Sequence, residues 1–179
     1  AYIKESGDYT ILDAMVPYDN DESKAKTMMD HLEKSFFHVV ENVGPHGLPL
    51  AMRADWNDCL RLGKKGESTF VAFQLYYAMS MMHELAAERK DDEYIAYLDK
   101  VQKALGEALA ACWDEDRFIR GIREDGVVVG AKKDPEASMW LNPQSWSVIS
   151  GFASKEQSDK AMQSVADILD TPYGAKLLD

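Results

Sequence analysis

Hydrophobic residues recur at helical spacing through most of the chain and predict three long helices. The first follows the capping residues 19–21 and ends at Gly44, the second covers about residues 67–89, and the third begins at Asp91 and Asp92. The second is apolar on almost all sides, which is typical of a buried helix. The other two each have one apolar face, which is typical of outer helices.

The pattern changes after Trp113 to short runs of β-prone residues. Residues 118–122 and 127–129 flank a polar turn at residues 124–126, and this arrangement predicts a β-hairpin. The hairpin is the only β excursion that the pattern predicts.

Two further helices are predicted near the end of the chain. Asn142 is placed as the cap of one, with Pro143 at its first helical position, and Ser154 with Gln157 forms a capping box for the other. Buried helices that alternate with one-sided ones favour an inner layer surrounded by an outer layer. The predicted fold class is therefore all-α, with one small β-hairpin.

Composition and charge narrow the classes of partner. The chain has 179 residues, 46% of them hydrophobic, which is enough for one packed domain. Its 20 basic against 31 acidic residues give a net charge of −11, which repels nucleic acid and anionic lipid. No run approaches the roughly 20 apolar residues of a membrane-spanning helix. The sequence thus predicts neither a nucleic-acid nor a membrane partner.

The cysteines and the chain ends lead to two further expectations. Cys59 and Cys112 have neither disulfide-scaffold nor zinc-ligand spacing, so we expect no metal site and a reducing, cytoplasmic location. The chain starts at Ala1 and stops after the segment TPYGAKLLD, which predicts a piece of a longer protein. A natural small domain whose initiator methionine has been removed is the alternative.

The connection between the first two predicted helices carries the candidate chemistry. It is longer than a simple link between helices requires, and it places Arg53, Asp55, Trp56, Asn57 and Asp58 within six positions. A flat aromatic ring beside hydrogen-bonding groups suits a sugar, which has an apolar face and a rim of hydroxyls. The alternative interpretation places Trp56 in the core, with Asp55 and Asp58 capping the next helix.

Three strings carry a resemblance to a known family. The loop motif ADWNDCL, the string LNPQSW near the end of the chain and the string YIKESGDYTILDAMVPYD near its start are similar to the catalytic domain of glycoside hydrolase family 94, the cellobiose phosphorylase family. The resemblance spans nearly the whole chain. It implies an (α/α)6 barrel, of which residues 1–179 would supply less than half.

The resemblance also implies an activity and a set of site residues. Asp58 corresponds to the general acid, Trp56 lines the subsite of the transferred sugar, and Arg53 and Asn57 are candidate substrate contacts. The reaction would be inverting phosphorolysis of a β-1,4-linked glucose disaccharide, in which cellobiose and phosphate form α-glucose 1-phosphate and glucose. Members that act on chitobiose or cyclic glucans read GDWNDGM here, so Ala54 and Cys59 favour the cellobiose branch.

Physical chemistry agrees that one carboxylate suffices for this reaction. Phosphate is already a nucleophile near neutral pH, so the enzyme needs an acid for the leaving oxygen and no base for water. The pKa of Asp58 must then lie above its usual value of about 3.9, through burial or through the negative charge of phosphate or Asp55. No metal or organic cofactor is expected, with inorganic phosphate as co-substrate.

Several alternatives stay open at this point. An inverting hydrolase would need a second carboxylate, for which Asp55 is too near Asp58 in sequence, although residues outside this chain could serve. A non-catalytic helical scaffold would leave the polar loop unexplained. The resemblance places the phosphate-binding residues outside this chain, so the isolated fragment should be inactive. Whether the parent protein is a homodimer is left open.

Two positions outside the central motif also have two interpretations. His46 is expected to bond to backbone in its turn rather than to substrate. Gln144 and Trp146 either face the interior of the barrel or belong to the core.

Overall fold

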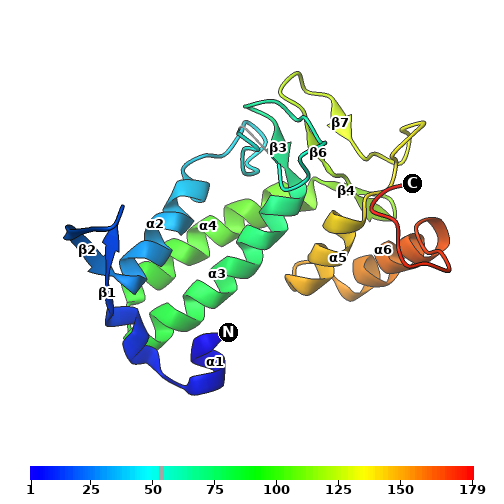
Figure 1. Cartoon of the computed structure of the whole chain (residues 1–179). Coiled ribbons are helices and arrows are strands. Elements are labelled where there is room, and N and C mark those ends of the chain that lie inside the picture. The colour runs from blue at the N-terminus through cyan, green and yellow to red at the C-terminus, as the bar shows by residue number, and fades with distance from the viewer. Residues whose placement is uncertain (53–54) are drawn as a thin grey trace. The chain divides into compact units, whose positions relative to one another are not determined.

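The computed structural model describes residues 1–52 and 55–179 (Figure 1). These residues form two compact units, Ala1–Glu41 and Asn42–Asp179. The first unit contains α1 (Tyr2–Ser6), the 3-10 helix η1 (Tyr9–Asp13), β1 (Met15–Tyr18), β2 (Asp21–Thr27) and α2 (Met28–Val40). The second contains β3 (Glu67–Ser68), α3 (Thr69–Arg89), α4 (Asp92–Ala110), β4 (Trp113–Asp114), β5 (Arg117–Phe118), β6 (Gly121–Ile122), β7 (Val128–Val129), α5 (Leu141–Ile149) and α6 (Lys155–Ile168). The described chain is thus predominantly helical, with small sheets.

The first unit corrects the predicted start of the first long helix. Residues 19–21 do not cap a helix, because β1 and β2 form an antiparallel hairpin in which Tyr18 is paired with Asp21. Asp19 and Asn20 make the turn with φ angles of 56° and 57°. Short polar side chains tolerate this left-handed conformation, so the same residue types that favour helix caps also favour two-residue hairpin turns.

Helix α2 therefore begins later than the pattern predicts. Its cap is Thr27, whose hydroxyl oxygen accepts a hydrogen bond from the Asp30 amide at 3.1 Å. The helix ends at Val40, before the predicted stop at Gly44. Its apolar face buries Met29 and Phe36, as the helical spacing predicts.

The two longest helices, α3 and α4, agree with the sequence. They lie side by side in Figure 1 and pack against each other. Ser68 caps α3 and Asp91 caps α4, each accepting an amide hydrogen bond within the first turn. Phe70, Phe73 and several further apolar residues of α3 are buried, Tyr76 and Tyr77 are half-buried, and Met81 is 36% exposed. The buried helix is confirmed, although one side of it is open in this chain.

The predicted hairpin forms, and the sheet around it is larger than expected. β6 pairs with β7 across the turn at residues 124–126, and it also pairs with β3 on its other edge. Its Gly121 is needed there, because a Cβ at this position would lie 2.5 Å from the backbone oxygen of Glu67. The predicted run 118–122 is divided, since Phe118 belongs to a separate hairpin of β4 and β5.

Helices α5 and α6 complete the second unit. α5 begins at Leu141 with Trp140 at the cap position, so Asn142 is not the cap and Pro143 lies within the first turn. Proline is tolerated there because the first amides of a helix have no partner within it. The predicted capping box of Ser154 and Gln157 is present in α6. Each helix in the described ranges is too short or too polar to cross a membrane.

Candidate functional site

The loop that carries the candidate residues is fastened to the strand just before α3. The Ala51 amide donates to the Gly66 carbonyl at 2.7 Å, and the Ser68 amide donates to the Pro49 carbonyl at 3.0 Å. Leu50 also forms a β-bridge with Glu67. The loop is therefore positioned by the three residues, 66–68, that lead into α3.

Glu67 holds the start of this loop with a buried carboxylate. Its Oε1 accepts hydrogen bonds from the backbone amides of His46, at 3.0 Å, and Leu48, at 3.2 Å. Its Oε2 lies 2.5 Å from the Nδ1 atom of His46. His46 thus bonds to a carboxylate and not to backbone as expected, and Glu67 is a loop-organising residue that sequence reasoning missed.

Gly44 makes room for this carboxylate. A Cβ at Gly44 would lie 2.3 Å from Cδ of Glu67. We expect Gly44→Ala to lower the free energy of unfolding by about 1–3 kcal/mol, because the Glu67 side chain must move out of its buried site. Thermal unfolding measures the effect.

Gly106→Ala is the matched control for that prediction. Gly106 lies inside α4, where an added Cβ would meet only ordinary contacts, at 3.8 Å and beyond. Alanine favours a helix over glycine, so this variant should gain up to about 1 kcal/mol. Equal stability for both variants would contradict the close packing of Gly44 against Glu67.

Asp55, the first carboxylate of the motif, is buried and fully engaged. It forms an ion pair with Arg120, and its Oδ1 accepts a hydrogen bond from the Ser68 hydroxyl at 3.0 Å. Its Oδ2 also accepts from the Asn57 amide at 2.9 Å. Asp55 therefore anchors the loop to residues far away in sequence. It is not placed to activate a water molecule, and its charge is balanced by Arg120.

Arg120 is the second functional residue that sequence reasoning missed. Its side chain is fully buried, and its guanidinium carbon lies 5.5 Å from the ring centre of Phe70 and 5.6 Å from that of Trp140. Burial lowers the pKa of Arg120, while the Asp55 carboxylate acts in the opposite direction. The one signal in the sequence is an arginine between β-prone apolar residues in the run 118–122.

Asp58, the second carboxylate, has a different environment. It is exposed and lines a groove of ≈ 470 Å³ together with Arg61, Lys64 and Glu124. Within residues 1–52 and 55–179, no hydrogen bond reaches its carboxylate. The two carboxylates of one motif thus differ in environment, since both line the groove but Asp55 is buried in an ion pair and Asp58 is exposed.

Trp56 lies on the surface beside these groups. Its side chain is 66% exposed and meets Phe70 edge-on, with ring centres 5.8 Å apart. Phe70 in turn approaches Trp146 at 6.0 Å, and Trp146 approaches Tyr77 at 6.2 Å. The alternative in which Trp56 belongs to the core is therefore wrong. The following helix is capped by Ser68 and not by either aspartate of the motif.

The remaining predicted positions have varied outcomes. The Asn57 side-chain oxygen accepts a hydrogen bond from the Cys59 amide at 3.0 Å, which stabilises the turn around Asp58. Arg53 lies outside the described residues. Gln144 is fully buried and bonds to both backbone groups of Phe118, at 2.8 Å each, so it links α5 to β5.

The cysteines and possible metal ligands do not add to the site. Cys59 and Cys112 are both unpaired thiols. Burial raises the pKa of Cys112 to about 11, so this thiol stays protonated at neutral pH. In the described part of the chain, no group of three or more His, Cys, Asp or Glu side chains is placed to hold a metal ion.

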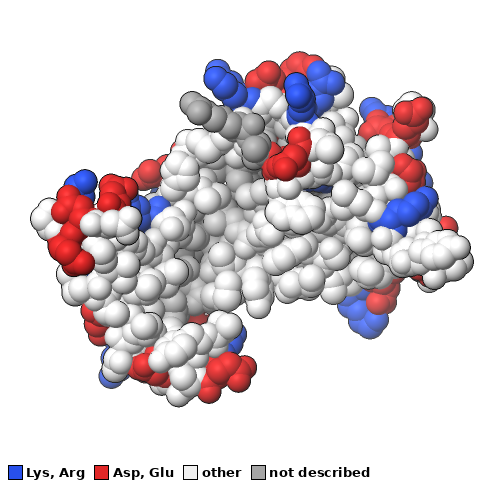
Figure 2. Space-filling view, in the orientation of Figure 1, with Lys and Arg blue, Asp and Glu red and all other residues white. Residues whose placement is uncertain are grey.

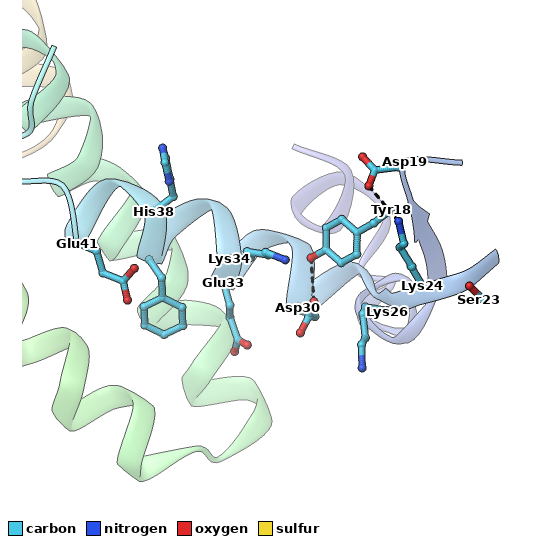
Figure 3. Close-up of a pocket in the computed structure, with 11 residues that line it drawn as sticks. Tyr18, Asp19, Ser23, Lys24, Lys26, Asp30, Glu33, Lys34, His38 and Glu41 are labelled. Carbon is cyan, nitrogen blue, oxygen red and sulfur yellow. Dashed lines mark hydrogen bonds and ion pairs between the residues drawn. The ribbon is translucent and has the colours of Figure 1, made fainter. Parts of the chain in front are cut away.

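A second, larger groove of ≈ 1020 Å³ lies in the first unit, between the β1–β2 hairpin and α2 (Figure 3). Tyr18 donates a hydrogen bond to Asp30 at 2.8 Å and lies beneath Lys34, whose Nζ is 4.4 Å from the ring centre. Lys24 pairs with Asp19 at 3.6 Å. The side chains that line this groove carry charges of both signs that largely compensate each other. The groove therefore has no clear preference for a ligand.

Charged side chains are unevenly spread over the face seen in Figure 2. Acidic and basic groups lie close together around the loops at the N-terminal end of α3, whereas the surface over α3 and α5 is mostly uncharged. A groove with both charge signs and an exposed indole nearby has the polar and aromatic groups that bind sugars.

Comparison with known proteins finds one matching family and several relatives. The family described as "Glycosyl hydrolase 94 superfamily, catalytic domain" matches residues 1–179. A solabiose phosphorylase of Paenibacillus borealis is 38% identical over 97% of this chain and 23% of its own length. An N,N'-diacetylchitobiose phosphorylase of Vibrio furnissii is 35% identical over 98% of this chain and 22% of its own.

A cellobionic acid phosphorylase of Neurospora crassa is 34% identical over 99% of this chain and 23% of its own length. The chain therefore spans about a quarter of the length of these relatives. A crystal structure of a GH78 family rhamnosidase of Bacillus sp. GL1 aligns with a TM-score of 0.62 at 19% identity, over 84% of this chain and 15% of that one. This last likeness concerns the fold alone.

Proposed function

The chain belongs to the catalytic-domain family of the glycosyl hydrolase 94 superfamily, and from this premise we propose that it is part of an inverting disaccharide phosphorylase. The substrate is a β-1,4-linked glucose disaccharide, with cellobiose as the reference compound. Inorganic phosphate is the co-substrate, and the products are α-glucose 1-phosphate and the released sugar. Neither a metal nor an organic cofactor takes part.

The contrast between the two motif carboxylates carries this proposal. Both line the groove, but Asp55 is buried and bonded to Arg120 and Ser68, which leaves Asp58 as the exposed motif carboxylate without such bonds among the described residues. An inverting phosphorylase needs one such group, because phosphate itself supplies the nucleophile. A hydrolase would need a second carboxylate to activate water, and the ion pair of Asp55 with Arg120 argues against Asp55 in that role.

Asp58 acts as the general acid in the proposed reaction. A phosphate oxygen forms a bond to the anomeric carbon of the glucose while the glycosidic C–O bond breaks. The proton of Asp58 goes to the departing oxygen, and the anomeric configuration is inverted.

The neighbouring residues bind the transferred sugar. Trp56 offers an exposed indole face for stacking against the pyranose ring, in keeping with its 66% exposure. We assign Asn57 and Arg53 as hydrogen-bonding contacts to sugar hydroxyls. The Asn57 side-chain oxygen is used within the turn, so its amide N–H groups would make this contact.

The proposed enzyme extends beyond this chain. The chain spans about a quarter of its relatives, and the partly open side of α3 at Met81 suits a helix that further packing would cover. We propose that the helices are part of an (α/α)6 barrel, that residues 1–179 form a partial catalytic domain without activity of its own, and that the enzyme works in the cytoplasm.

Phosphate dependence tests the proposed reaction. The full-length enzyme that contains this chain is incubated with cellobiose, with and without inorganic phosphate, and followed by phosphorus NMR. We expect a signal of α-glucose 1-phosphate, and at least a hundredfold slower release of glucose when phosphate is omitted. Glucose release at the same rate without phosphate would instead identify a hydrolase.

A further inference from the structure

The hydroxyl group of Ser68 joins three parts of the second unit. It donates a hydrogen bond to Oδ1 of Asp55 at 3.0 Å and accepts one from Nη1 of Arg120 at 3.1 Å. It also accepts a hydrogen bond from the Val71 amide at 3.4 Å, by which Ser68 caps α3. A hydroxyl has one hydrogen to donate and two lone pairs that accept. Ser68 therefore uses its whole hydrogen-bonding capacity in the folded protein.

Burial makes this hydroxyl difficult to replace. Ser68 and Arg120 are both 0% exposed, and Asp55 is 6% exposed. Bulk water therefore cannot readily supply a hydrogen bond that the hydroxyl gives up, and a buried polar group without a partner is unfavourable. The three side chains together hold the carboxylate of Asp55 at a defined place relative to the first turn of α3.

Two short turns extend this defined geometry from Asp55 to Asp58. Oδ2 of Asp55 accepts a hydrogen bond from the Asn57 amide at 2.9 Å, and the Asn57 side-chain oxygen accepts one from the Cys59 amide at 3.0 Å. The Leu60 amide also donates to the Asn57 carbonyl at 2.9 Å. Side chains that bond to the backbone two residues ahead fix the direction of the chain. Asp58 thus lies in a backbone segment whose hydrogen bonds begin at the buried carboxylate.

We propose that Ser68 is a positioning residue for the proposed reaction, because its hydroxyl holds the loop in the arrangement from which Asp58 reaches the departing oxygen. This inference rests on the proposed phosphorolysis and on Asp58 as its acid. Ser68 touches no substrate and transfers no proton. Since a displacement of about 1 Å can slow an enzyme reaction about a hundredfold, loss of the hydroxyl slows proton transfer without removing the acid.

Ser68→Ala tests this role in the full-length enzyme. We expect kcat for cellobiose phosphorolysis to fall about 10- to 100-fold. The same substitution in an Asp58→Asn background should change kcat less than about threefold, because a residue that acts through Asp58 then has no acid to position. Reductions that multiply in the double variant would overturn the proposal, since Ser68 would then act elsewhere.

The leaving group gives a second readout, in the Ser68→Ala variant alone. A glucoside of a strongly acidic phenol needs no protonation at its leaving oxygen, so the substitution should slow its phosphorolysis less than about threefold. An equal loss for this glucoside and for cellobiose would show a general disturbance of the protein, and would overturn the positioning role.

Two control variants separate the buried network from the helix cap. Ser68→Gly removes the hydroxyl, but glycine is nearly as good a cap as serine, so kcat should fall as far as in Ser68→Ala. Ser154→Ala removes the cap of a different helix, α6, and should lower the thermal unfolding temperature while kcat stays within about twofold. Near-normal kcat in Ser68→Gly, or a large loss in Ser154→Ala, would assign the effect to helix capping.

The outcomes also separate this inference from the proposed function. Phosphorolysis at the full rate in Ser68→Ala would overturn the positioning role and leave the proposed reaction intact. Absence of phosphorolysis in the unmodified full-length enzyme, or an unchanged kcat in Asp58→Asn, would overturn the proposed function, and the positioning role with it.

Discussion

Asp58→Asn is expected to lower kcat for cellobiose phosphorolysis by about 100- to 10,000-fold, the usual contribution of a general acid. Asparagine has nearly the shape of aspartate but no proton to give to the leaving oxygen. KM should change little, because Asp58 is exposed and supports no other residue in the described structure. Steady-state kinetics in the full-length enzyme measure both constants.

Two comparisons make this prediction specific. Glu124→Gln removes another exposed carboxylate that lines the groove and should keep kcat within a few fold, since no proton transfer is assigned to Glu124. A glucoside with a strongly acidic phenol as leaving group needs no protonation, so Asp58→Asn should slow it much less than cellobiose. Equal losses for both substrates would show that Asp58 is not the acid.

Arg120→Met is expected to lower the free energy of unfolding by about 3–5 kcal/mol. The substitution leaves Asp55 as an unpaired charge in a buried site, which is among the most unfavourable changes a folded protein can undergo. The substitution also removes the guanidinium from the rings of Phe70 and Trp140, which adds a smaller loss. Chemical denaturation of the purified protein measures the effect.

A double variant separates the charge from the packing. Asp55→Asn together with Arg120→Met removes both members of the pair and should recover a large part of the lost stability. Because the loop would then have lost its anchor, kcat should remain well below that of the unmodified enzyme. If the double variant were less stable than Arg120→Met alone, the ion pair would not explain the effect.

The sequence predicted well whatever depends on neighbouring residues. Ser68 and Asp91 cap their helices, and Ser154 forms its box with Gln157, because each of these interactions closes within one turn of the chain. The buried character of α3 follows from composition alone. The family could also be identified from the loop motif, because the motif is a continuous stretch of sequence.

Local signals misled where two structures compete for the same residue types. Asp19 and Asn20 are good helix caps, but they are equally good in a two-residue turn, and the pairing of β1 with β2 decided between them. At α5 the helix begins before Asn142, since the Leu141 amide donates a hydrogen bond to the Leu177 carbonyl at 2.9 Å.

By itself, the sequence predicted the predominantly helical character of the chain, its family and the loop that carries the candidate site residues. Only the tertiary structure decided that Asp55 is buried in an ion pair with Arg120, whereas Asp58 is exposed. The physical reason is that the partner of Asp55 is Arg120, which is 65 positions away and comes next to it through the pairing of β3 with β6. Buried charges need such distant partners, and no local pattern predicts where they lie.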